Sequence, residues 1–531
     1  MKTPFYLVAL LLLIQATTTA QSYKQRLNTI DIQHYKLALI VNDTTNSIDA
    51  TMDISLKFKA LLSEFQLDLV KKDSISGLGM VVDSIYQNNV KVSFTHENNK
   101  ILIQPIHTFP GIEYTYIIKY HGVPDDGLVI SKNLHGDRTF FGDNWPNRAH
   151  HWFPCIDHPS DKATVEYIIE APNHYQTIAN GFQIEETNIT NTTKQYHWKT
   201  EVPLPTKVMV IGIAKFAVQN IGETHNIPVS NWVYPQTKEQ GFYDFSTTKN
   251  ILNFFIENIG EYPFQKLANV QSKTRFGGME NAGNIFYFEE YVTGKKEHED
   301  LIAHEIAHQW FGNSVSEIDW SHIWLSEGFA TYFTDLYILN EKGEDDFLKR
   351  INEERETIFK FHKSKQSPVI DTKTTNYMQL LNANSYNKGA WVLHMLRKQI
   401  GDEAFWKGIK TYYSTYKFNN ATTNDFKNVM AQISNQNLDI FFKQWLKKIG
   451  HPILKTNWIY HNNKLRIIID QTQETVFQLP LDIEMIYSDG SSEIKTIQIT
   501  DKTAPYIIAT TGDVKEIKLD PNSWLLFELI E

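Results

Sequence analysis

The stretch that decides the fold and the chemistry is His304-Glu305-Ile306-Ala307-His308. A helix turns by about 100° per residue, so both histidines project from one face a single turn apart and can hold one metal ion. Neutral imidazole suits zinc, and a catalytic zinc ion takes three protein ligands and leaves one position for water. Glu305 lies one step along the helix, beside that position. The stretch therefore predicts a helix with two zinc ligands and a neighbouring carboxylate.

A third zinc ligand is expected from a second helix. Glu327 follows His308 within the segment 324–330, which has the pattern of a helix start. A short connection between the helices would place Glu327 beside the first helix. We therefore expect His304, His308 and Glu327 to bind one Zn²⁺ ion. The alternative from another class of function is a binding module with structural zinc, but such sites usually have four protein ligands and no adjacent base.

Residues 21–217 have the period of a β-rich domain. Between residues 48 and 59, apolar residues alternate strictly with Asp, Thr, Ser and Lys. This pattern recurs at Tyr114, Tyr116, Ile118 and Tyr120. Strict alternation places one face of a sheet on a core and the other in water. We expect an N-terminal antiparallel β domain.

Residues 218–452 change to a helical period, which predicts a mainly helical domain. Gly450-His451-Pro452 is expected to end one helix, and Thr422 with Asp425 has the pattern of a capping box at the start of another. The predicted core stripes of these two helices are Leu438, Phe441, Phe442, Trp445 and Ile449, and Phe426, Val429, Met430 and Ile433.

Residues 453–531 return to a period of two. Asp489-Gly490 offers a hairpin turn between two of the predicted strands. We expect a small C-terminal β-sandwich, which makes the chain an α+β protein of several domains. The alternating positions are Leu465, Ile467 and Ile469, then Leu481, Ile483, Met485 and Tyr487.

Charge and cysteine content exclude two further classes of function. The formal charge is −10, from 51 basic and 61 acidic side chains. Since nucleic-acid binding needs a basic face, we expect no nucleic-acid partner. Cys155 is the single cysteine of the sequence, so no intramolecular disulfide can form. We expect a small buried side chain there instead of a catalytic thiol.

Residues 1–20 have the pattern of a signal peptide. Lys2 precedes an apolar run from residue 5 to 14, and small residues follow up to Ala20. That run is too short for a bilayer core, which needs about twenty residues. We expect cleavage after Ala20 and export to the periplasm or the medium. No later segment is apolar enough to span a bilayer, so we expect no stable membrane insertion.

A second motif, Gly277-Gly278-Met279-Glu280-Asn281, lies upstream of the zinc pentapeptide. With residues 304–313, it resembles the gluzincin family of zinc aminopeptidases that includes alanyl aminopeptidases, puromycin-sensitive aminopeptidase and leukotriene hydrolase. The likeness extends to residues 154–159, 386–389 and 441–452. It implies a thermolysin-like catalytic domain for residues 218–452, and a short three-domain form of the family.

The resemblance also implies an activity. The chain is expected to hydrolyse the N-terminal residue from peptides with a free N-terminus, by attack of a zinc-bound water whose proton Glu305 accepts. Tyr386 is expected to donate a hydrogen bond to the oxyanion. Glu280 is expected to bind the free α-amino group, which a blocked N-terminus lacks. The implied substrate-binding segment is Gly277, Gly278, Met279, Glu280 and Asn281.

Two features differ from the family pattern. Relatives supply a second Gln or Glu for the substrate amine, but this sequence has Trp145 near that position, and an indole cannot accept a hydrogen bond. Either Asp143 or Asn144 takes over, or the contact differs here. Many relatives also continue into a large helical domain that closes over the site. We therefore expect an open cleft and a weak dependence on peptide length.

Two other enzymes compete with this interpretation. A thermolysin-like endopeptidase shares the zinc geometry but lacks the motif at 277–281, and cleavage of N-acetylated peptides would favour it. A leukotriene-type epoxide hydrolase activity is disfavoured by the predicted export. The preferred N-terminal residue, the physiological substrate and the oligomeric state are left open by the sequence.

Overall fold

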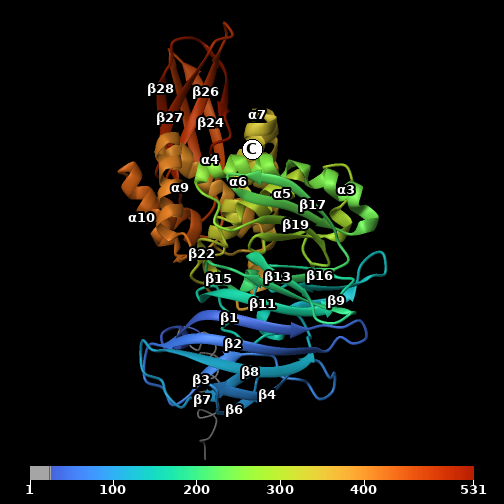
Figure 1. The fold of residues 1–531 in the computed structure, drawn as a ribbon. Helices are drawn as coiled ribbons and strands as arrows, with labels where there is room; N and C mark the ends of the chain where they lie inside the picture. The colour runs from blue at the N-terminus through green and yellow to red at the C-terminus, as the bar shows by residue number, and fades with distance from the viewer. Residues whose placement is uncertain (1–22, 24, 531) are drawn as a thin grey trace, which may run out of the picture. The chain divides into compact units, whose positions relative to one another are not determined.

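The structure is a computed structural model that describes residue 23 and residues 25–530 (Figure 1). The predicted signal peptide and its cleavage point lie outside the described residues. Among the described residues, no helix is both long enough and apolar enough to cross a membrane. The chain divides into two compact units. The first contains residues up to 256, 261–319 and 417–420, and the second contains 257–260, 320–416 and the rest from 421.

A nine-stranded sheet in the first unit confirms the predicted β-rich N-terminal region. Alternate residues from Ile48 to Phe58 are buried, as strict alternation predicts. All its pairs are antiparallel except β1 with β11, and the chain between these two strands provides the crossover that a parallel pair needs. The strands, several of which lie side by side in Figure 1, are in order β13 (Phe182–Asn188), β14 (Thr193–Lys199), β11 (Lys162–Pro172), β1 (Ile30–Ile40), β2 (Ile48–Phe58), β8 (Glu113–Val123), β4 (Gly79–Gln87) and β5 (Val90–Lys91), with β15 (Leu204–Pro205) paired to β11.

Two smaller sheets accompany it. One has the order β12 (Gln176–Ala179), β16 (Ile211–Ala214), β10 (Arg138–Gly142) and β9 (Leu128–Lys132), and the other β3 (Phe65–Asp68), β7 (Lys100–Gln104) and β6 (Ser93–Glu97). Cys155 is fully buried against β3, where its backbone nitrogen donates to the Asp68 carbonyl at 3.1 Å. This burial confirms the predicted small buried side chain, and it raises the pKa of the thiol well above the usual value.

A five-stranded sheet follows, which the sequence analysis missed. Strands β18, β19 and β21 pair in parallel, and β19 is buried along its whole length. A strand covered on both faces loses the period of two, so nothing in its pattern separates it from a helix. The order is β17 (Ala217–Thr224), β18 (Ile227–Val233), β19 (Leu267–Ser272), β21 (Asn284–Phe288) and β20 (Gly278–Met279).

The predicted helical region is present in both units. Around the five-stranded sheet run α3 (Lys238–Asp244), α4 (Thr248–Ile259) and α5 (Glu299–Ala307), and two short strands are β22 (Ser316–Glu317) and β23 (Asn420–Ala421). The helices of the second unit are α6 (Trp324–Lys342), α7 (Glu344–Ser364), α8 (Gly389–Ile400), α9 (Asp402–Tyr416), α10 (Thr423–Ser434) and α11 (Asp439–Phe442). Most of α6 is buried from Trp324 to Ile338, so it forms the core of that unit.

The local predictions for α10 and α11 had different outcomes. The capping box is present: Thr422 accepts from the Asp425 backbone nitrogen at 3.1 Å, and Asp425 accepts from that of Thr422 at 2.7 Å. Phe441, Phe442 and Trp445 are buried as predicted. Ile449 was wrongly placed on the same stripe, since it is 45% exposed. A wider π turn over Lys443–Lys447 ends the helix before Ile449, which breaks the 3.6-residue period.

Two sheets follow at the C-terminal end of the described chain. The predicted alternation is present, because Leu465, Ile467 and Ile469 are buried in β25. Asp489-Gly490 makes the predicted hairpin, with Gly490 at a φ of 87°. The first sheet has the order β28 (Thr503–Ala509), β25 (Lys464–Gln471), β24 (Ile453–His461) and β30 (Glu528–Ile530), and the second β27 (Ser492–Ile499), β26 (Leu479–Tyr487) and β29 (Val514–Leu519).

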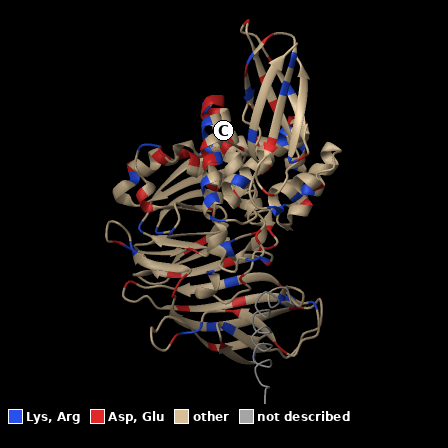
Figure 2. Cartoon of the chain, turned by 180° about the vertical axis from the view of Figure 1, so that it is seen from behind, with Lys and Arg blue, Asp and Glu red and all other residues tan. Residues whose placement is uncertain are grey.

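Charged residues are mixed along the elements of each unit. Lys and Arg are interspersed with Asp and Glu over strands and helices alike (Figure 2). Some pairs are buried, and Lys207 meets Glu317 at 2.6 Å with both side chains almost fully covered. This ion pair connects the end of the β-rich region to β22, and β22 follows the helix that carries His304 and His308 in the chain.

Candidate metal centre and substrate site

Helix α5 carries both predicted metal-binding histidines. His304 is in its last turn and His308 is its C-cap residue. Their Nε2 atoms face one another at 3.1 Å. Two nitrogen ligands of one tetrahedral zinc ion, each about 2.05 Å from the metal, would lie about 3.3 Å apart. The two imidazoles therefore already stand at nearly the separation that zinc requires.

The orientation of His308 is fixed by its other ring nitrogen. Its Nδ1 lies 3.1 Å from the Phe311 carbonyl oxygen, where it can only donate. The proton is thus on Nδ1, and the lone pair of Nε2 is left for a metal. The tight turn after α5, in which the Asn313 nitrogen donates to the His308 carbonyl at 3.1 Å, brings Phe311 back to this position. The residues present fit a zinc ion.

Two carboxylates adjoin this pair. Ligand atoms of Glu280, Glu305 and His308 all lie within 4.8 Å of one another. The three residues are between 1% and 5% exposed. Close carboxylates in a covered site repel one another, so the arrangement favours a cationic occupant. A metal ion and a substrate ammonium both meet this requirement.

Glu280 is held by amides that the sequence analysis did not assign. Gln309 Nε2 donates to the Glu280 carbonyl oxygen at 2.9 Å, and Asn313 Nδ2 donates to the same atom at 2.5 Å. Gln309 also accepts from the Gly283 nitrogen at 2.9 Å. Because Gln309 and Asn313 directly follow the zinc pentapeptide, they fix the carboxylate motif to the histidine helix. The sequence signal that could have indicated this role is the pair of amide side chains, four residues apart, that follows the motif.

The segment 277–281 runs along the edge of the five-stranded sheet. Gly278 lies opposite Tyr287, and Met279 opposite Phe286, in the β20–β21 pair. Because β20 is an edge strand, one side of its backbone has no strand partner in this sheet. Asn281 is fully buried next to it, and its side-chain amide has no hydrogen-bond partner among the described residues.

Gly278 leaves room for the Glu305 side chain. A Cβ atom at Gly278 would lie 2.6 Å from both Cγ and Cδ of Glu305 and closer still to Oε1. Gly277 faces a similar limit against the Tyr291 ring, at 2.6 Å. Close approach to Glu305 is therefore a physical reason for the glycine at 278.

Replacing Gly278 with Ala is expected to displace the Glu305 carboxylate. A shift of about 1 Å at a reacting group lowers kcat about 10²-fold. Steady-state kinetics on an aminoacyl amide would measure this loss. Gly512→Ala is the matched control, since a methyl group there meets nothing nearer than 3.4 Å. Wild-type kcat in Gly278→Ala would contradict the assignment.

Glu327 and Tyr386 belong to the second unit. Glu327 lies in the first turn of α6 and is 3% exposed. Tyr386 is half-buried in a π turn over Asn384–Lys388, just before α8. The two segments touch directly, because a Cβ atom on Gly328 would lie 2.8 Å from the Gly389 Cα and 3.1 Å from the Ser385 carbonyl oxygen. The sequence-predicted ligand and hydrogen-bond donor are thus on neighbouring backbones.

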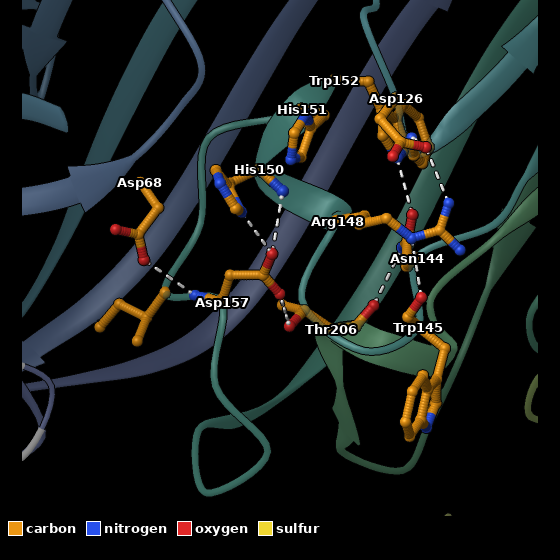
Figure 3. Close-up of polar contacts among 12 residues, drawn as sticks. Asp68, Asp126, Asn144, Trp145, Arg148, His150, His151, Trp152, Asp157 and Thr206 are labelled. Carbon is orange, nitrogen blue, oxygen red and sulfur yellow. Dashed lines mark hydrogen bonds and ion pairs between the residues drawn. The ribbon is translucent and has the colours of Figure 1, made fainter. Parts of the chain in front are cut away.

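The expected second amine contact is not provided by Asn144. Its side chain is fully buried, and Figure 3 shows its hydrogen bond to Thr206. Its Nδ2 donates to the Thr206 and Met209 carbonyls at 2.9 and 2.6 Å, and its Oδ1 accepts from Trp152 Nε1 at 2.8 Å. All three hydrogen bonds are structural.

Asp143 is engaged in the same way. Its carboxylate pairs with Arg148 at 2.9 Å and with Arg275 at 3.3 Å, and it is fully buried. The two guanidinium groups already neutralise it. The third alternative, that the amine contact differs here, is therefore the one that this geometry favours. Arg275 precedes the segment 277–281 and so anchors it to the β-rich region.

A buried lysine was also missed. Lys162 Nζ donates to the carbonyl oxygens of Asn313 and Ser314, at 3.2 and 2.8 Å, and of Asn419 at 2.9 Å. Burial lowers the pKa of this ammonium group well below its usual value. Lys162 holds the turn from which Asn313 supports Glu280. A single lysine in a strand gives no sequence signal for this role.

Comparisons with known proteins agree with this geometry. Residues 243–445 match the peptidase family M1 domain, and residues 32–208 match the peptidase M1 N-terminal domain. Glutamyl aminopeptidase of Homo sapiens is 28% identical over 346 residues, which are 62% of this chain and 36% of that protein. Glutamyl aminopeptidase of Rattus norvegicus is 27% identical over 348 residues, again 62% and 36%.

A third relative is matched over more of its length. Probable aminopeptidase 2 of Sulfurisphaera tokodaii is 27% identical over 439 residues, which are 77% of this chain and 54% of that protein. The chain thus spans about a third to a half of the length of these curated relatives. The chain belongs to peptidase family M1.

Proposed function

We propose that this chain is a zinc aminopeptidase that removes the N-terminal residue from peptides. The observation that carries the proposal is Glu280, a buried carboxylate whose ligand atom lies within 4.8 Å of those of Glu305 and His308. A carboxylate there pairs with the ammonium of a free N-terminus, so the first peptide bond lies next to the hydrolytic group. The relatives named glutamyl aminopeptidase and probable aminopeptidase 2 support the same activity.

One zinc ion is the proposed cofactor. His304 and His308 would hold it with their Nε2 atoms, and we propose Glu327 as the third ligand. Bound zinc supplies a Lewis acid that polarises the substrate carbonyl and lowers the pKa of water to about 7. The histidine geometry supports the first two ligands, and burial at a helix start supports the third.

Proton transfer and oxyanion binding are proposed for two side chains. Glu305 accepts the proton of the attacking water and passes it to the leaving amine, which is worth about 10²–10⁴-fold. The Tyr386 phenol, which stays protonated at neutral pH, donates to the developing oxyanion. Its position on a π turn beside the Glu327 helix supports this role, because such turns are frequent at functional sites.

The peptide backbone is proposed to align along β20. An extended peptide can pair with the open side of an edge strand by main-chain hydrogen bonds, whatever its side chains. Gly277, Gly278, Met279 and Asn281 would then form the substrate platform, with Glu280 at its end. This arrangement explains why the amine-binding carboxylate and the edge strand share one motif.

The remaining assignments are proposals of the same kind. We propose the boundaries 21–217, 218–452 and 453–531, a thermolysin-like arrangement for the middle domain, and a sandwich for the two C-terminal sheets. The apolar run at residues 5–14 supports export through a signal peptide.

A panel of aminoacyl fluorogenic amides, free and N-acetylated, tests the activity. We expect the free substrates to be hydrolysed much faster than the acetylated ones, complete loss of activity after treatment with a chelator, and recovery on adding zinc. An endopeptidase of the thermolysin kind would instead cleave acetylated peptides. Hydrolysis of both sets at equal rates, or full activity in chelator, would refute the proposal.

A further inference from the structure

The second unit contains a basic recess that the proposed mechanism does not use. Its volume is about 760 Å³, and it lies among the loop after α7, the start of α10 and the end of the π turn at 443–447. The lining includes His322, Lys365, Asp371, Lys373, Thr423 and Lys447. We call it the lysine recess.

The charge inside the lysine recess is unbalanced. The ammonium groups of Lys365, Lys373 and Lys447 make no ion pair or side-chain hydrogen bond with any residue that the structure describes. The acidic lining residue, Asp371, is used by its own turn: Oδ1 accepts from the Lys373 nitrogen at 2.9 Å, and Oδ2 accepts from Thr374 Oγ1 at 2.8 Å. These bonds lower the pKa of Asp371, as does nearby Lys365.

Uncharged polar groups complete the lining of the lysine recess. Thr423 and Asn424 are the first two residues of α10, and both line the recess. The capping-box carboxylate of Asp425 and the bond from the Thr423 nitrogen to His322 Nδ1, at 3.4 Å, already occupy part of this helix start, so the three lysines supply the charge of the recess. Ser367 and Thr372 contribute hydroxyl groups to the lining. The recess therefore offers charge and hydrogen-bond donors to a small oxyanion.

Other recesses of the same unit differ in charge. One recess of about 480 Å³ has Asp482 and Asp520 opposite Lys398, which pairs with Asp482 at 3.1 Å. Another, of about 510 Å³, has Glu474 and Glu528 in its lining, and Lys363 pairs with Glu528 at 3.1 Å. Their lysines are neutralised by these carboxylates, whereas those of the lysine recess are not.

The lysine recess adjoins the segments that carry two proposed active-site residues. Asn384 Nδ2 donates to the Ser367 carbonyl at 2.9 Å and to Ser367 Oγ at 3.2 Å, two residues before Tyr386. His322 Nδ1 lies 2.8 Å from Thr423 Oγ1, five residues before Glu327. The lining residues Ser367 and His322 therefore contact or belong to the segments that lead to Tyr386 and Glu327.

We propose that the lysine recess binds a small oxyanion, and that the carboxylate at the C-terminus of a short peptide substrate is its main source. This step rests on the proposed aminopeptidase function. A free inorganic or organic anion offers the same chemistry. Lysines on flexible stems suit a carboxylate whose position changes with peptide length, because each ammonium group can follow it.

The test compares peptides that end in a free carboxylate with the same peptides as C-terminal amides. The variant is Lys373→Gln combined with Lys447→Gln. We expect KM for the free acids to rise about fivefold, since each exposed ion pair is worth about 1.5- to 5-fold. KM for the amides and kcat for both are expected to stay unchanged. Lys349→Gln with Lys360→Gln, two exposed lysines of α7, removes the same charge as a control.

Titration calorimetry with inorganic sulfate gives a readout independent of catalysis. Sulfate binding that the lysine variant weakens and the control variant keeps would support the recess, even if the wild-type protein hydrolysed no peptide and the aminopeptidase proposal failed. The difference between acid and amide then tells whether the anion comes from the peptide. Equal sulfate binding in all variants, with equal KM for acids and amides, would overturn the inference.

Discussion

Replacing Glu305 with Gln is expected to lower kcat by about 10²–10⁴-fold while the protein still binds zinc. Gln has nearly the same shape as Glu but cannot accept and return a proton at neutral pH, so the loss measures general-base catalysis. His308 is expected to keep its geometry, because the Phe311 carbonyl orients its ring. Kinetics on an aminoacyl amide, with metal analysis of the same sample, would measure both quantities.

The matched control is Glu290→Gln, an exposed residue upstream of α5. It removes one negative charge without touching the site, and its kcat is expected to equal that of the wild type. If Glu305→Gln kept full activity with bound zinc, the proposed base would be wrong. If it lost zinc as well, Glu305 would be a ligand instead of a base.

The sequence predicted the parts of the site that lie close together in the chain. The helical period alone brings His304 and His308 to one face, and the structure has their Nε2 atoms 3.1 Å apart. Alternation predicted β2 and β25 correctly because one face of each is exposed and one is buried. Local periodicity predicts secondary structure reliably where one face of a strand or helix is exposed to solvent and the other is buried.

Contacts that depend on tertiary packing could not be predicted from the sequence. The five-stranded sheet was missed because β19 is buried on both faces and so has no alternating pattern. Lys162 contacts three carbonyls that are more than 150 residues away in sequence. The roles of Gln309 and Asn313 depend on where the Glu280 carbonyl lies after folding. Such roles follow from the three-dimensional arrangement, which no single segment encodes.

Replacing Glu280 with Gln is expected to lower kcat/KM for substrates with a free N-terminus by about ten- to hundredfold. A hydrogen bond between charged groups in a buried site is worth about 1.5–3 kcal/mol. The neutral amide of Gln can still accept a hydrogen bond from the ammonium, but it lacks the negative charge and binds more weakly. The backbone of Glu280 stays fixed by Gln309 and Asn313, so the side chain changes without moving β20. The same aminoacyl amide assay measures the loss.

The comparison that decides the role of Glu280 is the ratio of activity on free and N-acetylated substrates. An acetylated N-terminus has no ammonium, so Glu280→Gln loses no ion pair with it, and its slow hydrolysis is expected to stay constant or rise. The ratio should therefore fall by the full ten- to hundredfold. An equal loss on both substrates would mean that Glu280 acts on the metal or on Glu305. Because Glu280 adjoins both Glu305 and His308, this ratio separates amine recognition from a change in the electrostatics of the hydrolytic group.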